Sequence, residues 1–142
     1  MTRRLASLAL AFSVFLVALA AAPSAWAGSY LDRAALLLDQ ARKEGDLLQP
    51  RTHDKELVIL VKALAEVRVR VARKMEVPAA IAKAHPHLLL VLEASERAAS
   101  AAMDGNFKKF MEHLNVARDE ERIFRAVLAE LRYTLPELQN KR

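Results

Sequence analysis

The chain of 142 residues carries 22 Lys and Arg against 17 Asp and Glu, a formal net charge of +5, and it contains no cysteine. The lack of cysteine excludes disulfide bonds, thiol catalysis and covalent haem attachment through a Cys-x-x-Cys-His motif. Basic and acidic residues are interspersed and aromatic residues make up only 6% of the chain. Because nucleic-acid-binding proteins gather basic residues into a stripe with aromatic side chains between them, we expect no nucleic-acid partner.

Residues 1–27 have the pattern of a cleavable signal peptide. Arg3 and Arg4 form a positively charged start, an uncharged run of 18 residues follows, and Ala25 and Ala27 supply the small side chains that signal peptidase requires. An uncleaved membrane anchor is the alternative, because 18 apolar residues are almost long enough to span a bilayer. The cleavage pattern favours removal after Ala27. We therefore predict an exported protein, periplasmic or secreted, with no stable membrane insertion after cleavage.

After residue 27 the hydrophobic spacing is helical throughout, without the alternation typical of strands. We predict that residues 28–142 form one all-α domain, an antiparallel four-helix bundle following the signal-peptide helix. Ser29 is the expected N-cap of its first helix and Gly45 the expected end. The predicted inner face of that helix consists of Leu31, Ala34, Leu38 and Ala41.

A second helix is predicted from Thr52, as its N-cap, to about Met75. Its large apolar residues recur at alternating steps of three and four, which is the spacing of a helix that buries one face. We therefore expect five of these residues in the core: Leu57, Leu60, Leu64, Val67 and Val71.

Pro86 fits the first position of a third helix, and Asp104-Gly105-Asn106 forms the turn into a fourth, which should end near Tyr133. The short turn makes these two helices antiparallel. We expect bulky Phe107 and Phe110 to lie against the small residues of the third helix. Its inner face is predicted to be Leu88, Leu92, Ser95, Ala99 and Ala102, and that of the fourth Phe107, Phe110, Leu114, Ala117, Glu121, Phe124, Leu128 and Leu131.

The sequence carries no recognised catalytic motif. None of its four histidines has a Glu three residues before it, as di-metal bundle sites require, and no phosphate-binding loop is present. We therefore predict no enzymatic activity and no cofactor. His85 and His87 flank a rigid proline and could chelate copper or nickel weakly, or simply be solvated at a helix start.

Two charged residues break the apolar pattern. Glu121 falls within the inner face of the fourth helix, and Arg68 lies between Leu64 and Val71. We interpret them as a partly buried ion pair or as edge residues, the alternative being a pocket in which Arg68 anchors a small anionic ligand. A basic face on the second helix is interpreted as solvated, or else as a surface for an acidic partner or an anionic membrane: Lys62, Arg70, Arg73 and Lys74.

These observations favour binding over catalysis. We expect an exported, non-enzymatic helical-bundle protein that acts through protein-protein interaction in the cell envelope, with another envelope protein as its partner. The alternative is a periplasmic carrier of a small ligand or a metal.

Overall fold

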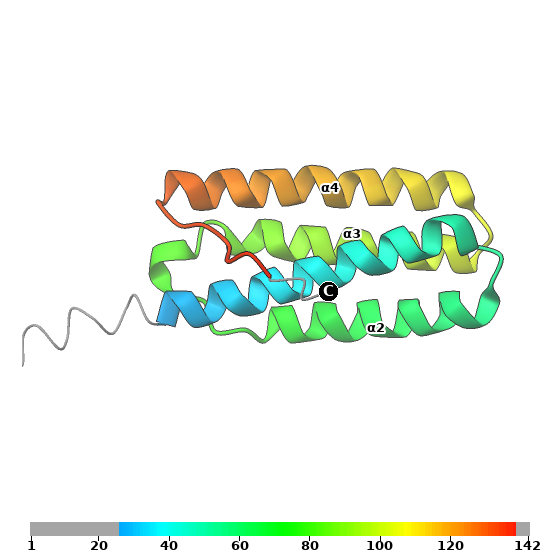
Figure 1. Cartoon of the computed structure of the whole chain (residues 1–142), viewed down its shortest axis with the longest axis horizontal. Coiled ribbons are helices and arrows are strands. Elements are labelled where there is room, and N and C mark those ends of the chain that lie inside the picture. Colours follow the sequence, from blue (N-terminus) through cyan, green and yellow to red (C-terminus); the bar gives the residue numbers. More distant parts are fainter. Residues whose placement is uncertain (1–25, 139–142) are drawn as a thin grey trace, which may run out of the picture.

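The computed structural model describes residues 26–138 (Figure 1). Within this range the chain forms four long helices and two short 3-10 turns, and no strand, which confirms the predicted all-α class. The predicted signal peptide lies almost entirely outside the described residues. The elements are an N-terminal helix (residues 26–48), η1 (Gln49–Arg51), α2 (Lys55–Arg73), η2 (Ala79–Ile81), α3 (His85–Met103) and α4 (Phe107–Glu130).

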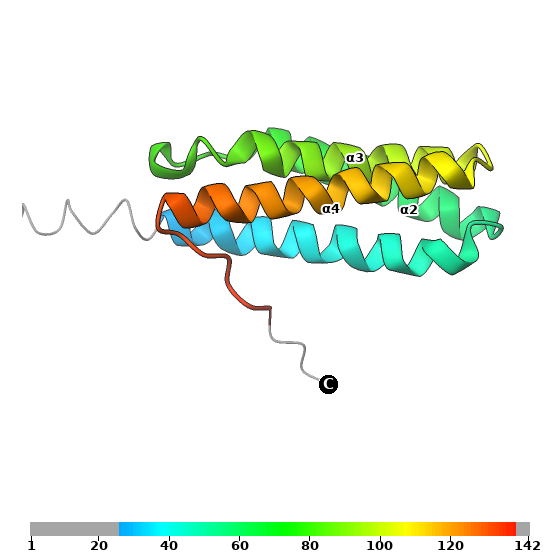
Figure 2. The same ribbon diagram turned by 90° about the horizontal axis from the view of Figure 1, so that it is seen from above.

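The four helices lie side by side along the long axis of the molecule, and successive helices run in opposite directions (Figures 1 and 2). α3 packs against both α2 and α4. The N-terminal helix is joined to α2 by an ion pair between Glu44 and Arg68, and to α4 by one between Arg42 and Glu121. It therefore lies between α2 and α4.

Short polar residues fix the helix ends. Asp54 precedes α2 in an extended conformation and its side chain accepts a hydrogen bond from the Leu57 amide at 3.1 Å, so Asp54 is the N-cap and the prediction of Thr52 is wrong. Asn106 caps α4 in the same way. Gly105 ends α3 with a φ of 70°, a conformation that costs glycine nothing, whereas Arg132 adopts a φ of 65° after α4.

The N-terminal helix is longer than predicted at both ends. Residue 26 is already helical, so Ser29 lies inside the helix and is not its N-cap. Gly45 also lies inside it, and the helix continues to residue 48. A Cβ atom at Gly45 would lie 3.0 Å from Cδ2 of Leu114. The glycine therefore permits close approach of α4 rather than ending the helix.

The core follows the predicted inner faces of three helices. In the N-terminal helix, α3 and α4 nearly all of the predicted residues are buried, including Phe110 and Phe124 with no exposed surface. Phe110 packs among the alanines at the end of α3, as expected. Phe107 is half exposed, so its predicted place in the inner face of α4 is wrong.

The predicted inner face of α2 is also wrong. Leu60, Leu64, Val67 and Val71 are between 44% and 56% exposed, and Leu57 is only partly buried. A neighbouring face with smaller side chains packs inward instead. It consists of Val58, Val61, Ala65, Arg68, Val69 and Ala72.

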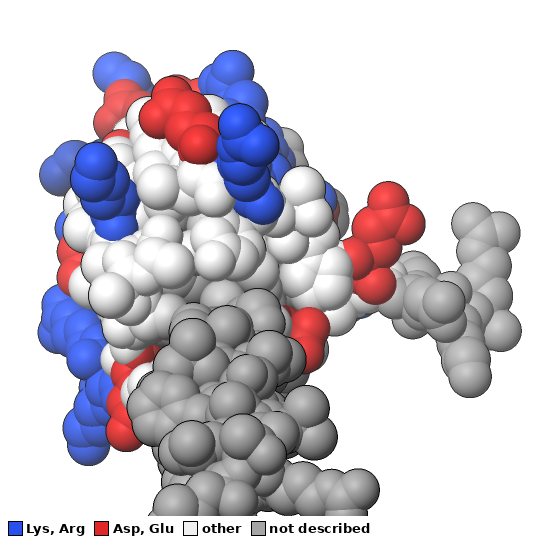
Figure 3. Space-filling model, turned by 90° about the vertical axis from the view of Figure 1, so that its left-hand side faces the viewer, with Lys and Arg blue, Asp and Glu red and all other residues white. Residues whose placement is uncertain are grey.

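One end of the molecule holds the junction between α2, η2 and α3. Buried Ile81, Ala84 and Leu88 close the core there. In Figure 3 the visible middle of this end is uncharged, and Lys, Arg, Asp and Glu side chains lie around its border. No helix within residues 26–138 combines the length and the apolar character needed to cross a membrane.

Candidate functional site

Arg68 and Glu121 are buried as predicted, with exposed fractions of 5% and 7%. Their predicted pairing with each other is wrong. Arg68 of α2 forms its ion pair with Glu44, whereas Oε1 of Glu121 accepts hydrogen bonds from Nη2 of Arg42 at 2.5 Å and from Nη2 of Arg125 at 2.7 Å. Both buried charges are therefore satisfied, by different partners.

The N-terminal helix supplies a partner to each buried charge. Arg42 and Glu44 are two residues apart, and positions two apart on an α-helix are rotated by about 200°. Their side chains therefore leave opposite flanks of the helix, Arg42 toward α4 and Glu44 toward α2. This arrangement explains why Arg68 and Glu121 do not meet.

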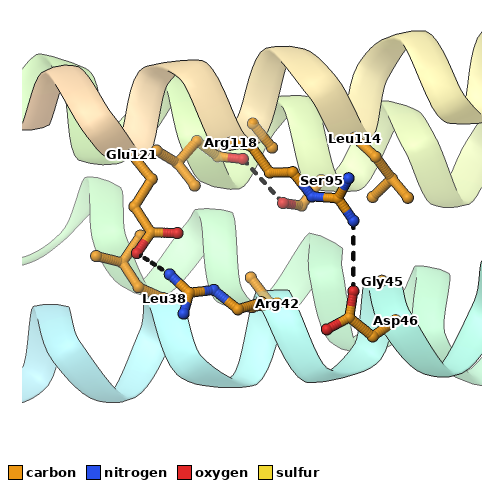
Figure 4. Close-up of a pocket in the computed structure, with 11 residues that line it drawn as sticks. Leu38, Arg42, Gly45, Asp46, Ser95, Leu114, Arg118 and Glu121 are labelled. Atoms are coloured by element: carbon orange, nitrogen blue, oxygen red, sulfur yellow. Dashed lines mark hydrogen bonds and ion pairs between the residues drawn. The ribbon is translucent and has the colours of Figure 1, made fainter.

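The crevice between the N-terminal helix and α4 is narrow (Figure 4). In that view Arg42 reaches Glu121 and Arg118 reaches Asp46, at 3.5 Å, across the gap. Ser95 of α3 also lines the crevice and donates to the Val91 carbonyl. The enclosed volume is about 30 Å³, enough for a water molecule but not for a ligand.

Among residues 26–138, Arg68 lines a cavity that is too small for a ligand. The cavity beside it, shared with Glu44, Leu48 and Phe110, has a volume of about 10 Å³. The guanidinium is held by Glu44 and surrounded by packed side chains. The alternative interpretation of Arg68 as the anchor of an anionic ligand therefore has no space in this conformation.

A larger cavity lies beneath the C-terminal segment. Residues 135–138 cross the flank of the N-terminal helix and α4, and a volume of about 330 Å³ remains between them, lined by Asp39, Arg42, Glu121 and Arg125. The arginines on this flank each face a carboxylate, including a contact between Arg122 and Asp119. Arg42 and Arg125 share one carboxylate, that of Glu121.

His85 and His87 point to different helices. Nδ1 of His85 lies 2.8 Å from the Tyr30 hydroxyl, and Nδ1 of His87 lies 3.0 Å from Oε2 of Glu120. Burial lowers the pKa of His85 and raises that of Tyr30 well above its usual range, so both are neutral at pH 7. Within residues 26–138 no three His, Cys, Asp or Glu side chains come together, so no third ligand of these types joins the predicted weak chelate at these histidines.

The predicted basic face of α2 is partly neutralised. Lys62 forms an ion pair with Glu66 that raises the pKa of the lysine and lowers that of the glutamate. Arg73 pairs with Glu93 of α3 at 2.8 Å. Arg70 and Lys74 are exposed near the end of the helix.

The outer surface of α2 is the most unusual feature of the described residues. We call Leu57, Leu60, Leu64, Val67 and Val71 the α2 stripe; the last four are 44–56% exposed. The five residues keep the alternating steps of three and four that mark a helix-packing seam. Leu57 packs partly against the core, whereas no part of residues 26–138 covers the outer surface of the other four. The periodicity of the sequence identified this seam but predicted that it lies in the core of the bundle. The signal that it overlooked is a second apolar series on the same helix, Val58, Val61, Ala65, Val69 and Ala72.

No protein-family model matches the chain, and neither the curated proteins nor the solved structures include a match.

Proposed function

We propose that this protein is an exported, non-enzymatic helical bundle that acts through protein-protein interaction in the cell envelope. The single observation that carries the proposal is the α2 stripe. Large apolar side chains in water cost free energy in proportion to their exposed area, and contiguous exposed patches of this kind are characteristic of interaction surfaces.

The spacing of the stripe supports a helical partner. From Leu57 to Val71 the stripe spans 14 residues, or about 21 Å of helix. Alternating steps of three and four create ridges into which the side chains of a second helix interdigitate. We propose export because residues 1–27 have the pattern of a signal peptide. We propose a non-enzymatic role because the sequence carries no recognised catalytic motif.

Photo-crosslinking tests the proposal. The chain is produced with its own leader, with a photoreactive amino acid replacing Leu64, and illuminated in intact cells. Val116 on α4 is the matched control position, because it is 43% exposed against 44% for Leu64. We expect a discrete covalent protein adduct from position 64 and none from position 116. Equal labelling at both positions, or no adduct at position 64, would overturn the proposal.

The cavity beneath residues 135–138 favours a second candidate, a periplasmic carrier of a small ligand. Its volume of about 330 Å³ lies within the usual range of ligand pockets. Charges of both signs line it together with Leu135 and Leu138, and this mixture suits an amphipathic ligand that carries both charges. Native mass spectrometry of the protein purified from its own compartment tests this candidate, since a bound ligand adds a fixed mass that unfolding removes.

A further inference from the structure

We propose that the α2 stripe is covered by a second copy of this chain, whose α2 runs antiparallel to the first across a two-fold axis. The inference rests on the proposed function, because the stripe is the binding surface in both. It goes further in naming the occupant. The resulting dimer would be the form that meets any other envelope protein.

The heptad spacing of the stripe sets the register. In an antiparallel pair of helices with this spacing, the side chains alternate so that Leu60 faces Leu64 of the second copy and Leu57 faces Val67 of the second copy. Two-fold symmetry repeats both contacts. The first four residues of each stripe are then paired, and Val71 lies beyond them at the end of the contact.

The charges beside the stripe are complementary to themselves. Glu56, Ala63 and Arg70 are spaced by seven residues and therefore follow one edge of the stripe. All three are exposed, and neither Glu56 nor Arg70 belongs to any ion pair formed within residues 26–138. In the antiparallel register Glu56 faces Arg70 of the second copy, and the symmetry-related pair forms at the other end.

The same edge argues against a parallel pairing. A parallel register would place Glu56 opposite Val61 of the second copy and Arg70 opposite Met75 of the second copy, so that neither charge gains a partner. The antiparallel register places Ala63 opposite itself on the two-fold axis. Its small side chain permits the two helices to approach closely there.

Exchange of the two charges tests the register. In Glu56→Arg, two arginines of one copy face two arginines of the other, and in Arg70→Glu two carboxylates face two carboxylates. We expect each variant alone to dimerise on the order of tenfold more weakly in sedimentation measurements at low salt. A mixture of the two variants restores every complementary pair, so the mixed dimer should regain the affinity of the unmodified protein.

A thiol at the two-fold axis provides a second test. The chain has no cysteine, so Ala63→Cys adds a single thiol that should lie opposite its symmetry mate. We expect rapid oxidation to a disulfide-linked dimer at dilute concentration. The matched control is Ala126→Cys, because Ala126 is an exposed helical alanine on α4, away from the stripe. It should form no disulfide-linked dimer under the same conditions.

Sedimentation of the purified protein and crosslinking in cells together distinguish failure of the dimer from failure of the proposed function. Sedimentation as a monomer up to submillimolar concentration, or failure of the mixed variants to recover affinity, would overturn the second copy as occupant. An adduct between position 64 and a different protein would then still support the proposed function. If position 64 gives no adduct in cells and the purified protein is monomeric, both fail.

Discussion

Removal of Glu44 should destabilise the protein more than its partly exposed position suggests. Its carboxylate is the ion-pair partner of Arg68, whose side chain is only 5% exposed, whereas the Glu44 side chain is 20% exposed. In Glu44→Gln the guanidinium stays buried and loses its compensating charge. Loss of one partner of a buried pair costs about 3–5 kcal/mol, and partial solvent access at this site places the expected cost near 2–3 kcal/mol.

Urea unfolding of four proteins measures this effect: the unmodified chain, Glu44→Gln, Arg68→Met and the double variant. Because the apolar side chain in Arg68→Met removes the buried charge, the double variant should be more stable than Glu44→Gln alone. We expect a coupling energy of about 1–2 kcal/mol between the two positions. Asp39→Asn is the control, since the side chains of its pair with Lys43 are more exposed, at 32% and 60%, and the pair should contribute less than about 0.5 kcal/mol.

A cost of Glu44→Gln equal to that of Asp39→Asn would refute the reasoning, because it would mean that Arg68 finds solvent or another partner without Glu44. A second cycle, between Arg68→Met and Glu121→Gln, distinguishes the observed pairing from the one expected from the sequence. The two charges have separate partners, so their changes in unfolding free energy should add.

The remaining predictions concern packing, pH, backbone conformation and processing. Phe124→Ala should cost about 3–5 kcal/mol and Leu64→Ala less than about 1 kcal/mol in urea unfolding of the monomer, because only Phe124 is fully buried. Burial lowers the folded-state pKa of His85 below the unfolded value near 6.5, so stability should fall as the pH is lowered through 6.5, and His85→Asn should remove that part of the decline. Arg132→Gly should raise the unfolding free energy by about 0.5–1 kcal/mol, since glycine adopts the φ of 65° without strain. Intact-mass measurement of the protein exported with its own leader should give a chain that begins at Gly28; a mass that includes the first 27 residues, in the membrane fraction, would support the anchor instead.

Sequence periodicity predicted three helices well because each has one apolar face. Leu88 and Leu92 in α3 and Phe110 and Phe124 in α4 are buried where their spacing placed them. The helix ends were less predictable. The sequence predicts a helix end at Gly45, but the role of this glycine depends on the approach of Leu114 from α4, which no local pattern reveals.

The partners of Arg68 and Glu121 could not be predicted from the positions of those two residues alone. Periodicity places a residue on a face of its own helix, but it does not say which neighbouring helix that face meets. No local pattern distinguishes Arg42 and Glu44 from other charged residues, since their contacts depend on the N-terminal helix lying between α2 and α4. The structure thus contains the ion pairs Arg42–Glu121 and Glu44–Arg68 in place of the single predicted pair between Arg68 and Glu121.

The error in α2 has a physical origin that also supports the proposed interface. This helix carries two apolar series, and the side chains of the outer one are larger than those of the inner one. The inner face packs beside small residues of α3 such as Ala98 and Ala99, and apart from Arg68 its own buried side chains are valine and alanine. The larger leucines lie on the outer face. A helix in so small a domain can bury only one of two apolar faces by itself. The other face of α2 keeps regular seam spacing and carries self-complementary charges along one edge. Contact with another helix explains both features best.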